Sequence, residues 1–489
     1  MTTVTQSLPA VQLPAVDSLD RFPADFRWGV ATAAYQIEGG AREGGRGPSI
    51  WDTFSHTPGV SFHGDNGDIA CDHYNRWESD LELLSSLGVS DYRLSVSWSR
   101  LQPLGAGALN PDGVAFYRRL LSTLCDRGIR PLITLYHWDL PQPLEDAGGW
   151  PNRDTAHRFA EYAGQVLRAL GDLADDWITL NEPWCSATLG YGTGAHAPGR
   201  RNDADALAAA HHLNLAHGLA VSRIRSERPH ARVGITNIVT DIVPRTRTAD
   251  DLGAVRRLDA GNNRLFLDPV YTGDYSAAVR ETFAGLGLDD LIEPGDLGII
   301  AQPTDFAGIN HYQRVVAWHD LEAGYLEVGE RPAEPATTSF GWSVIPESLT
   351  AVLTRVAREF TTLPIYVTEN GASFADYVDP NGHVIDTERV EYLRGYIDAA
   401  GEAIADGVDL RGYYAWSFLD NFEWAEGYSK RFGLVYVDYR TQERIPKLSA
   451  RWYRRLIADF TTQGDRPEPR ERTARPLPAP PTQAPDNHS

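Results

Sequence analysis

Short apolar runs, rich in β-branched and aromatic residues, recur along the chain, and each is followed by a polar loop. The runs occupy residues 26–36, 89–98, 130–138, 174–183, 231–239, 304–313, 363–371 and 410–418. Runs of this length and composition, bounded by loop residues, predict β-strands. The pattern therefore predicts eight strands spread over most of the chain.

The segments between these runs have a different period. Apolar residues recur at three- and four-residue steps over residues 111–127, 154–170 and 343–360, which predicts helices. Eight strand-then-helix units in a row indicate a parallel sheet with helical crossovers, and eight is the number that closes into a (β/α)₈ barrel. A doubly wound open sheet is the alternative, but no Gly-x-Gly-x-x-Gly motif follows the first run. We therefore expect an α/β protein, a single TIM barrel with its active site at the C-terminal ends of the strands.

Charge and cysteine content narrow the class of protein. The 489 residues carry a formal net charge of -21, which disfavours binding to nucleic acid or to an anionic membrane. No stretch is apolar enough to span a bilayer, and the first twenty residues lack the pattern of a secretion signal. Cys71, Cys125 and Cys185 are too few and too scattered for a disulfide framework. We expect a cytoplasmic protein with no nucleic-acid or membrane partner.

The two ends of the chain differ in composition from the part between them. Residues 463–489 are rich in Pro and Arg and poor in large apolar side chains, so they cannot bury enough surface to offset the chain entropy lost on folding. Residues 1–20 precede the first predicted strand. We expect both ends to be disordered, and residues 21–462 to form the catalytic domain.

In a TIM barrel the C-terminal ends of the strands meet on one face, so the residues that end the runs are expected around one pocket. Amides, an imidazole, carboxylates and aromatic rings there suit a polyhydroxylated ligand with a flat ring face. They include no cluster suited to a metal, and no cofactor is expected. These residues are Gln36, Trp98, His137, Asn181, Glu182, Asn237, Asn310, Tyr312, Glu369 and Trp416.

Two carboxyl groups in this set indicate a reaction type. Glu182 lies in "LNEP" and Glu369 in "TENG", and glycoside hydrolysis uses one carboxyl to protonate the leaving oxygen and another at the anomeric carbon. Taken alone, Asn-Glu-Pro is also typical of a helix start and Asn-Gly of a turn. Their joint position on the fourth and seventh strands of one barrel favours the catalytic interpretation.

Seven stretches, in order, give the chain a close resemblance to glycoside hydrolase family 1, the β-glucosidase family, over roughly residues 21–462. They are "FRWGVATAAYQIEG", "YRLSVSWSRL", "LYHWDLPQPL", "TLNEPW", "INHYQ", "YVTENG" and "SFLDNFEWAEGYSKRFGLVYVD". The resemblance implies a retaining β-glucosidase that acts on terminal β-D-glucosyl residues of cello-oligosaccharides and of aryl or alkyl β-glucosides. It leaves open β-galactosidase or β-fucosidase side activity, transglycosylation and the oligomeric state.

The resemblance also implies roles for particular residues. Glu369 is implied as the nucleophile and Glu182 as the acid/base. Arg93 and Tyr312 are the candidates that keep Glu369 ionised, and the charge of Glu369 is expected to raise the pKa of Glu182. Further implied supporting and sugar-binding residues are Asn310, Gln36, His137, Asn181, Trp416, Glu423 and Trp424, with Trp342 and Trp184 on the leaving-group side and a cis peptide between Trp416 and Ser417.

Two alternative functions remain to be weighed. In the 6-phospho-β-glucosidases of this family, a Ser, a Lys and a Tyr together bind the phosphate. At these three positions this chain has Glu423, Lys430 and Phe432, so only the Lys is matched. A carboxylate at position 423 would repel a sugar phosphate, which argues against that activity. A non-catalytic sugar-binding protein is the second alternative, and it would have lost one of the two carboxyl groups.

Overall fold

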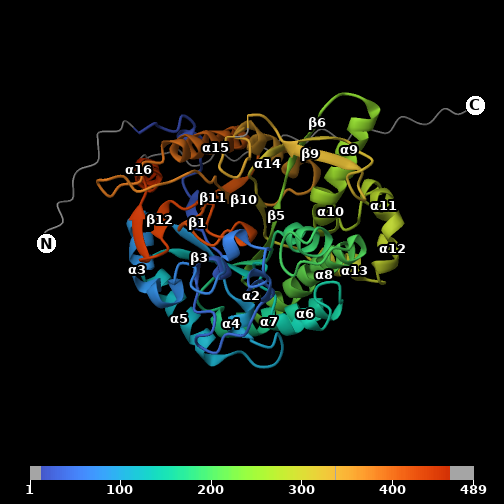
Figure 1. Cartoon of the computed structure of the whole chain (residues 1–489), viewed down its shortest axis with the longest axis horizontal. Helices are drawn as coiled ribbons and strands as arrows, with labels where there is room; N and C mark the ends of the chain where they lie inside the picture. Colours follow the sequence, from blue (N-terminus) through green and yellow to red (C-terminus); the bar gives the residue numbers. More distant parts are fainter. Residues whose placement is uncertain (1–12, 336, 463–489) are drawn as a thin grey trace, which may run out of the picture.

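The computed structural model describes residues 13–335 and 337–462, and the predicted barrel is present. Eight parallel strands close into a ring in the order β1-β11-β10-β7-β5-β4-β3-β2 (Figure 1). Each lies within one of the eight predicted runs. The strands are β1 (Arg27–Ala31), β2 (Asp91–Ser95), β3 (Arg130–Tyr136), β4 (Asp176–Asn181), β5 (Arg232–Ile238), β7 (Phe306–Asn310), β10 (Ile365–Asn370) and β11 (Leu410–Trp416).

Helices connect the strands and form the outer layer of the barrel (Figure 1). Two of the predicted helices begin where expected, whereas the third begins at Glu347 rather than at residue 343. Pro346 explains the difference, because the residue before a proline is disfavoured in the helical conformation. The long helices are α3 (His73–Ser86), α5 (Pro111–Asp126), α7 (Asp154–Leu170), α8 (Asp203–Glu227), α14 (Glu347–Glu359), α15 (Thr387–Ala405) and α16 (Leu448–Thr462).

Shorter helices and two small sheets occupy the loops. A three-stranded sheet of β6 (Asp241–Pro244), β8 (Arg314–His319) and β9 (Val328–Pro332) follows directly on β5 and β7, which places it beyond the C-terminal end of the barrel. A hairpin of β12 (Val435–Asp438) and β13 (Glu443–Pro446) follows β11. The shorter helices are α1 (Ala34–Ile37), α2 (Ile50–Ser55), α4 (Trp98–Leu101), α6 (Gln142–Asp146), α9 (Ala249–Asp259), α10 (Leu265–Tyr271), α11 (Ala277–Phe283), α12 (Leu288–Leu291) and α13 (Asp296–Ile300).

The N-terminal end of the barrel is closed by ion pairs. Five neighbouring strands, β1 to β5, begin with Arg27, Asp91, Arg130, Asp176 and Arg232, so basic and acidic residues alternate around this edge. Arg27 lies 2.6 Å from Asp176 and 3.4 Å from Asp91, Arg130 lies 2.7 Å from Asp91, and Arg232 lies 2.6 Å from Asp176. Both aspartates are almost fully buried, so each needs these partners to offset the cost of desolvation.

The ordered domain begins earlier than the sequence predicts. Val16 and Leu19 are buried against the rest of the domain, the Ser18 amide donates to Asp398 at 3.0 Å, and Trp452 Nε1 donates to the carbonyl of Pro14 at 2.7 Å. The boundary expected at residue 21 is therefore too late, because apolar side chains in this segment find partners on α15 and α16. Residues 1–12 and the predicted tail at 463–489 lie outside the described residues. Across residues 13–335 and 337–462, the structure contains no helix with the length and apolar character needed to cross a membrane.

Candidate active site

A cavity of about 340 Å³ lies at the C-terminal ends of the barrel strands. Its wall includes His137 after β3, Glu182 after β4, Glu369 near the end of β10 and Trp416 at the end of β11. The small sheet outside the barrel adds Glu330 of β9 to the lining. Strands that are far apart in the sequence thus contribute side chains to one concave surface.

Irregular strand ends present the two carboxyl groups. The pairing of β4 with β5 shifts register between Ile178 and Asn181, and β10 shifts register against both of its neighbours near Glu369. A bulge of this kind changes the direction in which a side chain points. Glu182 also has a positive φ of 45°, a strained conformation that is held in part by its amide, which donates to the carbonyl of Thr236 at 2.8 Å.

Glu369 is surrounded by hydrogen-bond donors. Arg93 Nη1 forms a short hydrogen bond with Glu369 Oε1, and the hydroxyl of Tyr312 donates to Oε2 at 2.6 Å. Burial raises the pKa of Glu369 above its usual value, while the charge of Arg93 and the hydroxyl of Tyr312 oppose that shift. The expected pairing of Glu369 with Arg93 and Tyr312 is therefore present.

Glu182 has a different environment. Its Oε1 accepts a hydrogen bond from Asn310 Nδ2 at 2.6 Å, and its Oε2 lies 3.2 Å from the thiol of Cys185. No arginine or lysine of the described residues forms an ion pair with it. Burial is the main cause that raises the pKa of Glu182 to about 8, and the charge of Glu369 is second. The sequence interpretation named only the second cause, because burial depends on the tertiary structure.

A chain of side chains behind the cavity fixes the orientation of His137. Arg93 Nη2 donates to Asn181 Oδ1 at 2.5 Å, which leaves Asn181 Nδ2 facing His137 Nε2 at 3.1 Å. Burial and the charge of Arg93 hold the pKa of His137 well below its usual value, so the ring is neutral. Since Nε2 accepts from Asn181, the ring proton is on Nδ1, which has no partner among the described residues. His137, which lines the cavity, thus has one ring donor without a partner in the described part of the protein.

A third carboxyl group, that of Glu423, lines the cavity, and the amide of Gln36 lies beside it. Gln36 Nε2 donates to Asn421 Oδ1 and to the carbonyl of Phe422, both at 3.0 Å, and lies 3.4 Å from Glu423 Oε2. Its Oε1 is buried and has no partner among the described residues. Burial, Glu369 and Glu182 raise the pKa of Glu423 to about 8. Within the described ranges, Gln36 therefore has one hydrogen-bonding atom without a protein partner next to the lining residue Glu423.

Aromatic rings line the remaining surface. Trp416 and Trp424 lie parallel to the ring of His137, each with its centroid 6.0 Å away. The peptide bond between Trp416 and Ser417 is cis, as the resemblance implies. Trp184 and Trp342 line the same cavity, where Trp184 Nε1 donates to Asn262 Oδ1 at 3.1 Å.

The carboxyl pair, the free hydrogen-bonding atoms and the parallel rings agree with the result of sequence comparison. The family model described as glycosyl hydrolase family 1 matches residues 18–461. The chain belongs to this family.

Relatives within glycosyl hydrolase family 1 cover nearly the same length. The chain is 46% identical over 441 residues to "Beta-glucosidase A" of Thermotoga maritima, which covers 90% of this chain and 98% of the relative. It is 46% identical over 462 residues to the "Bifunctional beta-D-glucosidase/beta-D-fucosidase" of Bifidobacterium breve, over 90% and 99% of the two chains. Among solved structures, the Thermotoga maritima enzyme in complex with deoxynojirimycin has a TM-score of 0.87 at 45% identity, over 90% of this chain and 99% of the other. The psychrophilic β-glucosidase of Micrococcus antarcticus has a TM-score of 0.88 at 46% identity, over 91% and 99%.

The structure brings most of the predicted site residues together. Those that line the cavity are His137, Glu182, Trp184, Tyr312, Trp342, Glu369, Trp416, Glu423 and Trp424. Four others, Arg93, Asn181, Asn310 and Gln36, hydrogen-bond to these from behind. The predicted set therefore forms one connected site.

Two residues of the strand-end prediction, Trp98 and Asn237, neither line the cavity nor form a side-chain hydrogen bond to any described residue that lines it. Trp98 begins α4, is fully buried, donates from Nε1 to Gln102 at 3.0 Å and stacks on Tyr162 of α7. It faces the helical layer, because a residue at a strand end points outward as often as inward. Asn237 is also buried outside the lining of the cavity. The prediction that these two side chains line the pocket is wrong.

The lining also includes residues that were not predicted, among them Trp138, Cys185, His196 and Glu330. Trp138 has a positive φ of 76° and packs on Trp424 with a centroid distance of 4.6 Å. Cys185 follows Glu182 by three positions, and its amide donates to the carbonyl of Glu182 at 3.0 Å. Residues three positions apart in a helical turn lie on the same face, so the spacing of Cys185 from Glu182 could have predicted this contact. Within the described part of the chain, no group of three or more His, Cys, Asp or Glu side chains is arranged to hold a metal ion.

Proposed function

We propose that this chain is a retaining β-glucosidase that releases terminal β-D-glucosyl residues from cello-oligosaccharides and from aryl or alkyl β-glucosides. The observation that carries the proposal is the unequal environment of the two buried carboxyl groups. Arg93 and Tyr312 both contact Glu369, whereas the pKa of Glu182 is raised to about 8. One group therefore suits a nucleophile and the other an acid at neutral pH.

The reaction proceeds in two displacements. In the first, a carboxylate oxygen of Glu369 attacks the anomeric carbon while Glu182 gives its proton to the glycosidic oxygen, and the alcohol leaves. The ester at Glu369 carries no charge, so Glu182 becomes more acidic and then removes a proton from water. The water oxygen attacks the anomeric carbon, and Glu369 leaves as a carboxylate. The proposal places the two carboxyl groups about 5 to 5.5 Å apart, as a retaining mechanism requires.

The surrounding groups have roles in binding the sugar. We assign Asn181 to the 2-hydroxyl, and the unpartnered atoms Gln36 Oε1 and His137 Nδ1 to other hydroxyls of the glucosyl unit. Glu423 and Trp424 complete this set, with Trp416 beneath the ring. Trp184 and Trp342 flank the leaving group, where a flat surface accepts varied aglycones. Fucosidase or galactosidase side activity and transglycosylation are proposed as secondary, because they use the same groups.

The 6-phosphate alternative receives no support from the cavity. Of the described residues that line it, none is a lysine or arginine. Lys430 instead donates to the carbonyl of Ser339 at 2.9 Å and lies 3.6 Å from Glu426. A dianionic phosphate next to Glu423 would thus have no cation to balance its charge. The cytoplasmic location stays a prediction, in keeping with the free thiols of Cys71, Cys125 and Cys185.

Hydrolysis of a panel of p-nitrophenyl glycosides by the purified protein tests the proposal. We expect turnover of the β-glucoside, negligible turnover of its 6-phosphate, and labelling of Glu369 by a 2-fluoro-2-deoxyglucoside. Glu369→Gln is expected to abolish turnover. The matched control is Glu145→Gln, a largely buried carboxyl with a raised pKa that accepts from Tyr191 and does not line the cavity. Label on another residue, or equal loss in both variants, would overturn the assignment.

A further inference from the structure

Lysine occurs at only two positions of the chain, 430 and 447, although lysine and arginine together number 45. Lys430 keeps part of its side chain exposed, whereas the side chain of Lys447 is 0% exposed. A buried ammonium group is costly unless carboxylates and hydrogen bonds compensate it. Lys447 must therefore form strong contacts in the folded protein.

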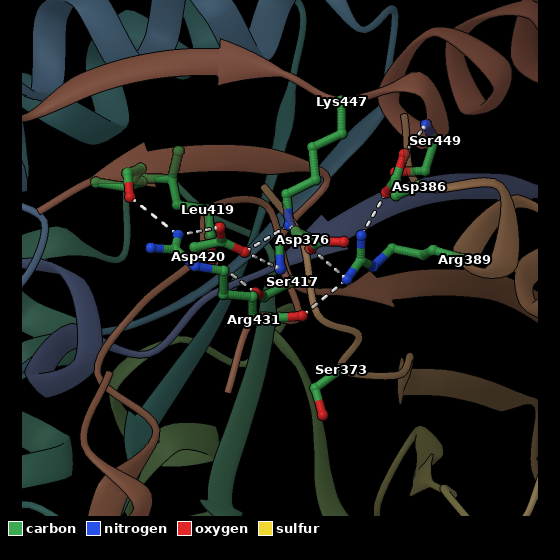
Figure 2. Close-up of polar contacts among 12 residues, drawn as sticks. Ser373, Asp376, Asp386, Arg389, Ser417, Leu419, Asp420, Arg431, Lys447 and Ser449 are labelled. Carbon is green, nitrogen blue, oxygen red and sulfur yellow. Dashed lines mark hydrogen bonds and ion pairs between the residues drawn. The ribbon is translucent and has the colours of Figure 1, made fainter. Parts of the chain in front are cut away.

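Two buried carboxylates from different loops provide these contacts (Figure 2). Lys447 Nζ donates to Asp376 Oδ2 at 2.5 Å and to Asp420 Oδ1 at 2.7 Å. Asp376 lies in the loop that follows β10, downstream of Glu369. Asp420 lies in the loop that follows β11, between Trp416 and Glu423. The single ammonium group thus joins the loop after the proposed nucleophile to the loop that carries Glu423.

The surrounding arginines form a longer route between the same loops, because Arg389 also donates to the carbonyl of Arg431 at 2.8 Å. Arg389 pairs with Asp376 at 2.7 Å and with Asp386 at the start of α15, and Arg431 pairs with Asp420 at 2.7 Å. Three aspartates and three cations therefore balance in charge in this part of the structure (Figure 2). Among the ion pairs of the described residues, those of Lys447 are the ones that connect Asp376 to Asp420.

Asp420 is connected to the lining residue Glu423 through its neighbour Asn421 and through Gln36. The next residue, Asn421, accepts from Gln36 through Oδ1 at 3.0 Å and donates through Nδ2 to Ser417 at 3.1 Å. Gln36 also bonds to the carbonyl of Phe422 and reaches Glu423. A displacement of Asp420 would therefore move the segment that places Glu423 and its partner Gln36.

We propose that Lys447 is a positioning residue that fixes Glu423 relative to Glu369 and thereby determines recognition of the hydroxyl groups on C4 and C6 of the sugar. Its two carboxylate partners are held within about 5 Å of each other by the shared ammonium group. Without the ammonium group the two loops lose their shared hydrogen-bond donor, and the carboxylates, no longer balanced by its charge, repel each other. This inference rests on the proposed function, which assigns Glu423 to the glucosyl unit.

The test compares a glucoside with a xyloside, because β-xylosides lack the hydroxymethyl group of C6. Lys447→Met keeps the length and apolar body of the side chain and removes its charge. We expect kcat/KM for p-nitrophenyl β-glucoside to fall at least tenfold more than kcat/KM for p-nitrophenyl β-xyloside. A purely structural role would lower both values equally, and an equal loss overturns the proposal.

Arg27→Met is the matched control. Arg27 also lies between two buried carboxylates, Asp91 and Asp176, but at the opposite end of the barrel. This variant is expected to lose stability and to keep the glucoside-to-xyloside ratio of the unmodified enzyme. A changed ratio in Arg27→Met would show that the ratio responds to general destabilisation, and the inference would fail.

A second variant covers the case in which Lys447→Met does not fold. Lys447→Met combined with Asp376→Asn restores the charge balance while leaving the two loops without their common cation. We expect this double variant to fold and to have a glucoside-to-xyloside ratio between that expected of Lys447→Met and that of the unmodified enzyme, because the repulsion is relieved while the shared donor is still missing. A ratio equal to that of the unmodified enzyme refutes the positioning role.

Binding calorimetry separates the inference from the proposed activity. Affinity for deoxynojirimycin should fall at least tenfold in Lys447→Met, and affinity for the imino-xylitol that lacks the hydroxymethyl group should stay within about twofold. If the unmodified protein bound both but hydrolysed neither glycoside, only the proposed function would fail. Equal affinity losses for both compounds would overturn the positioning role alone.

Discussion

Esterification of Glu369 should shift the pKa of Glu182 downward by a predictable amount. Two unit charges about 5 Å apart interact by about 3 kcal/mol at an effective dielectric constant of about 20. Since 1.36 kcal/mol corresponds to one pKa unit, loss of the Glu369 charge should lower the pKa of Glu182 by about two units. The group starts at about 8. Burial does not change with esterification, so a pKa of about 6, still above the usual value, is expected in the glycosyl enzyme.

The pKa of Glu182 in the free enzyme and its pKa in the glycosyl enzyme control opposite limbs of two different pH profiles. Glu182 must be protonated for the first displacement, so kcat/KM should fall as the pH rises through about 8. Glu182 must be deprotonated to activate water in the second displacement. Reactivation of the enzyme trapped by 2-fluoro-2-deoxyglucosyl fluoride should therefore slow as the pH falls through about 6. Both rates are measurable with p-nitrophenyl β-glucoside, the second through recovered activity after removal of the inhibitor.

Coinciding midpoints in the two profiles would refute the reasoning, because they would mean that Glu182 does not sense the charge of Glu369. Glu182→Ala provides the control. In that variant azide should take over from water as the attacking nucleophile, and the limb near pH 6 should disappear. If the limb persists without Glu182, another group is responsible for it.

Three further predictions concern single side chains. Tyr312→Phe removes the 2.6 Å donor to Glu369, which is worth about 1.5 to 3 kcal/mol, so kcat/KM should fall roughly 10- to 100-fold and its acid limb should move to higher pH. Cys185→Ala removes the thiol next to Glu182, a contact that lowers the pKa of that group, so the alkaline limb of kcat/KM should move to higher pH; a shift to lower pH would contradict the assignment. Asp91→Asn weakens the ion pairs to Arg27 and Arg130 at the closed end of the barrel, and urea unfolding should show a loss of about 3 to 5 kcal/mol with unchanged kcat at 25 °C.

The sequence contains enough information to predict the barrel and the meeting point of its catalytic groups. Parallel strands joined by helices force their C-terminal ends onto one face, so finding Glu182 and Glu369 at two strand ends was sufficient to bring them together. The same rule failed for Trp98, which stacks on Tyr162 in the helical layer. Strand position determines at which end of the barrel a residue lies, while side-chain direction depends on local bulges and turns that the pattern does not reveal.

Electrostatic environment was the second property that the sequence could not supply. The sequence identified Glu369 as a neighbour that raises the pKa of Glu182, but burial contributes more to that shift. The sequence treated Glu423 as a charged carboxylate, whereas burial and its two neighbours raise its pKa to about 8. Both pKa shifts depend on how completely the surrounding loops exclude water. The periodicity of apolar residues predicts helices and strands but not how the loops pack.

A cation between two carboxylates has different consequences at the two ends of this barrel. Arg27 joins Asp91 to Asp176, but these residues begin strands whose spacing is already fixed by backbone hydrogen bonds. An ion pair there contributes to stability but hardly affects the distance between Asp91 and Asp176, because the strands already fix it. Lys447 joins Asp376 to Asp420 directly in loops beyond the strand ends, where the other connection between them is the longer route through Arg389 and Arg431. The shared ammonium group therefore determines a distance there, and a change in that distance appears as altered sugar selectivity.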